Sequence, residues 1–132
     1  MTTPNSVKCI NHAAIIAGEN IPSSNLAVAV EQGSGKIVLA DCNKNNRIIG
    51  FSLYPAGIGE KVLINTEVIT FNKSKLTPGC TYFIKKQGSI SVYGDLPLGE
   101  PKTPSKYITE VGQAVSDQVL VLNFIIHNPV FN

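Results

Sequence analysis

The sequence predicts an all-β protein, a compact antiparallel β-sandwich or barrel of about 8–10 short strands with an extended N-terminal arm. Three observations lead to this prediction. Turn-favouring residues interrupt the chain about every 8–12 residues, a spacing typical of short antiparallel strands. The segments between the turns are rich in β-branched residues, which favour strands. The chain has 132 residues, enough for one domain that buries its own core without metal or disulfide support.

The individual strands are expected between successive turns. Gly33 and Gly35 lie in a loop between two apolar runs, which predicts a hairpin. Residues 77–79 place Pro and Gly at the second and third positions of a type II turn. Gln87-Gly88 predicts a second tight hairpin. The apolar or β-rich runs are 13–17, 26–30, 36–40, 48–53, 61–71, 81–85, 89–93, 107–116 and 119–126, and the Pro-rich segment 94–106 is expected to be a loop.

One segment near the C-terminus also fits a helix. Apolar residues recur there at nearly helical spacing, at Ile108, Val111, Val115, Val119 and Leu122. The glycine at 112 and the many β-branched residues argue against a helix. We therefore predict two strands, 107–116 and 119–126, with the aspartate at 117 in the turn between them.

The first dozen residues differ from the rest of the chain because they have weak periodicity and no turn-rich boundary. They indicate an extended N-terminal arm over 1–12, followed by a single β domain over 13–132. An arm of this kind is either disordered or bound to a neighbouring subunit.

The charged residues are few and scattered. They make up 15% of the chain, below the roughly 25% typical of soluble domains, with a net charge of +2. This low share suggests surface that is buried in an assembly. No basic stripe is present, so we expect no direct binding of nucleic acid. No segment approaches about 18 consecutive apolar residues, so no membrane span is expected. Residues 1–10 are polar and do not form a signal peptide, which predicts synthesis in a cytoplasm.

A glycine-rich segment, Gly33-Ser34-Gly35-Lys36, is similar to the end of a phosphate-binding loop. The complete motif needs Gly where this chain has Val30, and Ser or Thr where it has Ile37. It also needs a following helix, whereas a strand is expected here. The hairpin turn is therefore the better interpretation.

Metal ligands and catalytic pairs are not apparent. His12 and His127 lie at opposite ends of the chain, without a partner at ligand spacing. The three cysteines, Cys9, Cys42 and Cys80, are widely spaced and are expected to be reduced thiols packed as small hydrophobic residues. A cysteine–histidine nucleophilic pair has no local support. We therefore predict no cofactor and no metal.

The carboxylates do not form a recognisable catalytic pair. Most of them lie in or beside turns, where contact with solvent explains them. A glycosidase could bring two of them together across a cleft, but a chain of this size without Trp is poorly suited to that chemistry. We therefore predict that the protein is not an enzyme. The acidic residues are Glu19, Glu31, Asp41, Glu60, Glu67, Asp95, Glu100, Glu110 and Asp117.

The turns and strands also follow a characteristic order. In chain order the series is AGENI (17–21), LAV (26–28), GKIVLAD (35–41), IG (49–50), GEKV (59–62), LTPG (76–79), YF (82–83), GSI (88–90), VGQAVS (111–116) and LVL (120–122). This order resembles a family of small all-β modules of tailed bacteriophages and prophages, which includes capsid-decoration proteins and recurs in head-fibre and tail-fibre proteins. The resemblance covers about residues 13–123, and that family has no catalytic motif.

The resemblance implies a structural virion protein, a capsid-decoration or cement protein that binds the outside of the head and stabilises the shell. The implied partner is the major capsid protein, the implied location is the capsid surface, and a homotrimer suits the three-fold positions of a capsid lattice. The arm is expected to add a strand to a neighbour's sheet edge. The residues predicted to make that contact are Thr2, Thr3, Pro4, Asn5, Ser6 and Val7.

Three alternatives remain open. A tail-fibre, baseplate or head-fibre component could bind host surface glycans, and a cluster of exposed aromatic residues at one loop end, from Tyr54, Tyr93 and Tyr107, would favour it. A small hydrolase would need two carboxylates or a cysteine–histidine pair that converge in a cleft. The third alternative is a cellular β domain with no phage connection, and only the ordered series of turns argues against it.

Overall fold

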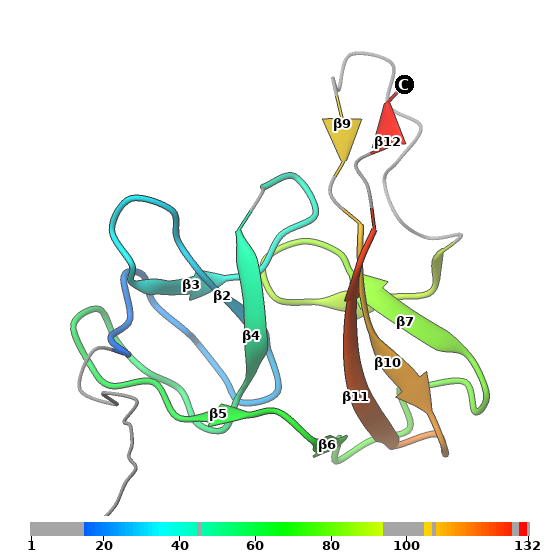
Figure 1. The fold of residues 1–132 in the computed structure, drawn as a ribbon. Helices are drawn as coiled ribbons and strands as arrows, with labels where there is room; N and C mark the ends of the chain where they lie inside the picture. The colour runs from blue at the N-terminus through cyan, green and yellow to red at the C-terminus, as the bar shows by residue number, and fades with distance from the viewer. Residues whose placement is uncertain (1–14, 45, 94–104, 107, 128–129, 132) are drawn as a thin grey trace, which may run out of the picture.

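The computed structural model describes residues 15–44, 46–93, 105–106, 108–127 and 130–131. These residues form an all-β fold, as the sequence predicted, with two main antiparallel sheets and a separate two-stranded sheet (Figure 1). The four-stranded sheet has the order β3-β2-β4-β5, and the five-stranded sheet has the order β6-β11-β10-β7-β8. The strands are β2 (Ala27–Val30), β3 (Ile37–Leu39), β4 (Arg47–Ser52), β5 (Ile64–Asn65), β6 (Val68–Thr70), β7 (Thr81–Ile84), β8 (Ile90–Ser91), β10 (Thr109–Ala114) and β11 (Val119–Ile126).

The predicted turns are confirmed by their backbone geometry. Gly79 has φ +85°, and the Cys80 amide donates to the Thr77 carbonyl oxygen at 3.1 Å, as a type II turn requires. Gln87 and Gly88 have φ +51° and +83°, which defines a type I′ turn between β7 and β8. The strands β10 and β11 pair antiparallel, so the two-strand interpretation of the C-terminal segment is confirmed.

Two segments differ from the prediction. The run 61–71 is divided between β5 and β6, which belong to different sheets. The Asn65 side chain explains the break, because it accepts a hydrogen bond from the Glu67 amide at 3.0 Å and donates one to the Val68 carbonyl oxygen at 2.7 Å. Such bonds stabilise a turn in place of a continuous strand. Within the segment predicted to be a loop, β9 (Ser105–Lys106) pairs with β12 (Val130–Phe131).

The two sheets share a hydrophobic core. Phe51 of β4 is fully buried and stacks on Phe124 of β11, with 6.4 Å between ring centroids. Ala27 and Ala29 of β2 contribute small side chains to this core, which allows the sheets to approach. From the five-stranded sheet, the core receives Ile69, Tyr82, Ile84, Val111, Ala114 and Leu120.

The four-stranded sheet is covered on its other face as well. Val28 points to that face, because side chains alternate along a strand, and it packs in a second cluster with Ile21 and Val62. The segments 15–21 and 53–63 supply the covering residues. The molecule therefore has three layers: these covering segments, the four-stranded sheet and the five-stranded sheet. The covering segments and the outward face of the five-stranded sheet are its two opposite surfaces.

A buried hydroxyl joins the segment 23–26 to β4. Ser52 is fully buried, and its Oγ donates to the Ser23 carbonyl oxygen at 2.9 Å and accepts from the Leu26 amide at 3.1 Å. We expect Ser52→Ala to lower the free energy of unfolding by about 1–2 kcal/mol, because the Leu26 amide and the Ser23 carbonyl each lose a hydrogen bond that is partly shielded from water. Urea denaturation measures this loss. Ser34→Ala, at an exposed turn hydroxyl, is the control, and equal losses for the two variants would contradict the prediction.

Candidate functional site

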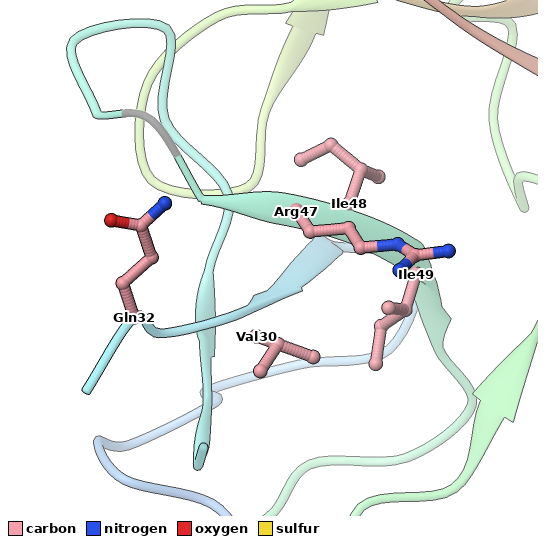
Figure 2. Close-up of a pocket in the computed structure, with 5 residues that line it drawn as sticks. All are labelled: Val30, Gln32, Arg47, Ile48 and Ile49. Carbon is pink, nitrogen blue, oxygen red and sulfur yellow. The ribbon is translucent and has the colours of Figure 1, made fainter. Parts of the chain in front are cut away.

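The first candidate site is a shallow hollow at one end of the four-stranded sheet (Figure 2). It has a volume of about 500 Å³ and lies between the end of β2 and the start of β4. The Arg47 side chain lies along β4 beside Ile49, and Val30 of the neighbouring strand also lines the hollow. Within the described residues Arg47 makes no ion pair, so it presents a cation at the edge of an apolar surface. The hollow is wide open and encloses little of any ligand.

The second candidate is a smaller hollow of about 310 Å³ on the outward face of the five-stranded sheet. Strand register explains its composition, because Thr81, Gln113 and Val121 lie opposite one another on three neighbouring strands. Asn123 lies two residues beyond Val121 and therefore shares its face. We call this feature the outer hollow, and its lining residues are Thr81, Glu110, Gly112, Gln113, Val115, Val121 and Asn123.

A register shift between Glu110 and Gly112 gives the outer hollow its carboxylate. With regular pairing, Val111 would lie opposite Phe83 on the outward face and Glu110 would point into the core. The shift reverses this arrangement, since Glu110 pairs with Phe83 and Val111 is fully buried. Gly112 permits the irregularity, because its φ of +156° is one that other residues rarely adopt.

A group of rings lies beside the outer hollow. Phe83 packs edge-to-face against Tyr93 at 5.6 Å and lies 6.2 Å from the His127 ring. The His127 Nε2 is 3.5 Å from Glu110 Oε1. Tyr93 is 51% exposed, so part of its ring is open to a ligand. We call Phe83, Tyr93 and His127 the ring group.

The third candidate is a set of four exposed apolar residues on the covering segment 53–63, which we call the loop patch. It consists of Leu53, Tyr54, Ile58 and Leu63, which are 40%, 63%, 74% and 49% exposed. The Leu53 amide donates to the Leu63 carbonyl oxygen at 2.9 Å, which holds the two ends of the segment together. Its aliphatic surface is unusual for a loop in contact with water, because such residues are normally buried.

The loop patch lies next to the first described residues of the chain. The Val62 amide donates to the Ile15 carbonyl oxygen at 3.1 Å, and the Ala17 amide donates to the Glu60 carbonyl oxygen at 2.8 Å. The predicted arm over 1–12 and its contact residues, 2–7, lie outside the described residues. The chain therefore enters the described fold beside the loop patch.

The remaining sequence predictions have clear outcomes where the structure describes them. Residues 33–36 form the predicted hairpin turn, in which Ser34 Oγ donates to Glu31 Oε1 at 2.7 Å, and a strand follows. Cys42 is buried and Cys80 is partly buried. Cys9, His12 and Tyr107 lie outside the described residues. Tyr54 and Tyr93 follow strands of different sheets, and the ring contact of Tyr93 is with Phe83.

Sequence reasoning missed the proximity of Glu110 and His127. The two residues are 17 positions apart in the chain, and only the irregular pairing of β10 with β11 places them on one face. Their spacing contains no metal-binding signal, and no group of three or more His, Cys, Asp or Glu able to hold a metal occurs among the described residues. The described part also contains no helix long and apolar enough to cross a membrane.

In comparisons with known proteins, no family model matched the chain, and no curated protein or solved structure matched it significantly.

Proposed function

We propose that this chain is a structural virion protein of a tailed bacteriophage, which decorates the outside of the head and stabilises the shell. The observation that carries the proposal is the loop patch, an exposed aliphatic and aromatic surface on one side of a small β-sandwich. Exposed patches of this kind mark surfaces that bind another protein. The phage assignment is an analogy, and it rests on the ordered series of turns along the chain.

The proposed mechanism is mechanical. A module that binds across a seam between capsid subunits adds buried surface that must be lost before the shell opens. Tyr54 and Ile58 are the most exposed members of the loop patch and would provide the central contacts with the major capsid protein. The arm, with its predicted contact residues 2–7, precedes the segment 15–17, which is hydrogen-bonded to residues 60–62 beside this patch. Arm and patch would therefore bind the same subunit or adjacent subunits. A homotrimer at a three-fold position would close the contacts into a ring.

The proposal is tested by mixing the purified chain with heads that lack the decoration protein, prepared from the phage that encodes the chain. Saturable co-sedimentation and a higher bursting temperature of the heads are expected. Ile58→Asp is expected to weaken binding by about tenfold or more, because a charge replaces a central apolar contact. Val115→Asp is the matched control, since Val115 is similarly exposed but lies on the opposite surface. Equal affinities for all three proteins, or no binding to heads, would refute the proposal.

The ring group favours a second candidate function, that of a tail-fibre, baseplate or head-fibre component that binds host surface glycans. The Tyr93 ring is partly exposed and is held in place by its edge-to-face contact with Phe83. An exposed ring held in this way is suited to stacking on a sugar. Sedimentation with tails or host cells, together with no binding to heads, would favour this candidate over decoration.

A further inference from the structure

We infer that the outer hollow is a binding site for a neutral saccharide, with Glu110, Gln113 and Asn123 as the groups that contact its hydroxyls. The inference does not depend on the proposed role in the head. The outer hollow and the loop patch are on opposite surfaces of the three-layered fold, so a molecule attached through its loop patch would keep the outer hollow open to solvent.

The polar groups of the outer hollow suit an array of hydroxyls, which need donors and acceptors placed side by side. The Asn123 amide forms no side-chain hydrogen bond with any described residue, and it is exposed. The Gln113 amide is oriented, because its Nε2 donates to the Gly79 carbonyl oxygen at 3.0 Å and its Oε1 is left as an acceptor. The Thr81 hydroxyl can both donate and accept.

The walls of the hollow suit the C–H faces of a sugar ring. Val115 and Val121 form an aliphatic border. On β7, Phe83 follows Thr81 on the same face and lies opposite Glu110, so the ring group borders the hollow. The volume of about 310 Å³ is at the lower end of the range for small-molecule sites, which fits one or two sugar rings of a longer glycan.

Charge selects the class of saccharide. Glu110 contributes a carboxylate to the lining, its Oε1 lies 3.5 Å from the His127 Nε2, and neither Lys nor Arg lines the hollow. A carboxylate accepts hydrogen bonds from neutral hydroxyls but repels an acidic sugar. We therefore expect hexoses or N-acetylhexosamines to bind, and sialylated or uronic saccharides to be rejected.

The same face could instead bind a second copy of this chain through Val68, Val121 and Ile125, which are 44%, 42% and 41% exposed. The polar groups argue against this occupant. The fully buried centre of a protein interface is depleted in charged residues, whereas a second copy packed on Ile125 would cover Glu110, which lies opposite it on the neighbouring strand. A saccharide solvates that carboxylate with its hydroxyls.

To test the inference, the full chain is titrated with lactose, diacetylchitobiose and sialyllactose. Binding is measured by calorimetry and by ligand-observed saturation-transfer NMR. At least one of the two neutral disaccharides is expected to bind with a Kd in the millimolar range or tighter, and sialyllactose is expected to bind at least about tenfold more weakly. Asn123→Ala is expected to lose about tenfold in affinity. Asn123 is exposed, so the variant should fold as the parent chain does, which a thermal melt checks. Glu110→Gln is expected to weaken binding of the neutral disaccharide, because a hydroxyl contact is altered, and to reduce its advantage over sialyllactose, because the amide carries no charge.

Gln32→Ala is the matched control, because it removes an exposed amide from the hollow on the other sheet. It should leave saccharide affinity unchanged. Failure of both neutral probes to bind, or unchanged affinity in Asn123→Ala, overturns the inference. Concentration-dependent dimers that Val121→Asp dissociates also overturn it, in favour of a second copy. The Ile58→Asp variant separates the two proposals, because it should lose binding to heads and keep binding to the saccharide.

Discussion

Phe51→Ala is expected to lower the free energy of unfolding by about 3–5 kcal/mol, the largest effect of any single substitution considered for this fold. Phe51 is fully buried between the sheets and stacks on Phe124 of the opposite sheet. Its partner across the β2–β4 pair is Ala27, whose small side chain cannot fill the space that the ring leaves. A cavity would therefore remain at the junction of the two sheets. Urea denaturation followed by circular dichroism measures the loss.

Two variants make this prediction specific. Phe51→Leu keeps most of the volume and is expected to cost less than about 1.5 kcal/mol. Tyr54→Ala removes a ring three positions away that is 63% exposed, and it should change stability by no more than about 0.5 kcal/mol. A loss for Phe51→Ala as small as that of Tyr54→Ala would show that the two sheets do not depend on this contact.

Gly112→Ala is expected to lower the free energy of unfolding by about 2–4 kcal/mol, because the new methyl group would clash with the main chain of the neighbouring strand. A Cβ at this position would collide with the Val121 carbonyl oxygen on the neighbouring strand. That backbone belongs to the β10–β11 pair, so the register shift that turns Glu110 outward would be disturbed as well. Thermal unfolding measures the loss of stability, and saccharide titration measures the disturbance of the outer hollow.

Gly59→Ala is the control for the glycine substitution. Gly59 also has a positive φ, +86°, but a Cβ there would meet nothing within 4 Å. Gly59→Ala should therefore lower the free energy of unfolding only by the backbone strain, about 1–2 kcal/mol. Equal losses of unfolding free energy in the two variants would show that the close approach of β11 to Gly112 does not affect stability.

The sequence predicted the parts of the fold that depend on local turn chemistry. The Pro78-Gly79 and Gln87-Gly88 turns were identified because few residues other than glycine adopt a positive φ. The C-terminal hairpin was identified despite its nearly helical spacing, because Gly112 and the β-branched residues disfavour a helix. These signals lie within a few residues of the structures that they specify.

The division of 61–71 could not be predicted in the same way. The run has strong β propensity throughout, and only the hydrogen bonds of Asn65 with Glu67 and Val68 show where the chain leaves one sheet for the other. The loop patch escaped prediction as well. Leu53, Ile58 and Leu63 are residues that sequence patterns place in a core, and their exposure depends on which segments cover the second face of β2.

The sequence by itself determined the fold class, most of the strands and the turns between them, since alternation of side chains and turn geometry act over short distances. The tertiary structure alone decided which residues meet on the outer surfaces. Glu110 reaches His127 and the outer hollow only because the register shift beside Gly112 reverses the faces of Glu110 and Val111. A shift of one residue moves a side chain to the opposite face of a sheet, and that shift is set by pairing between strands that lie far apart in the chain.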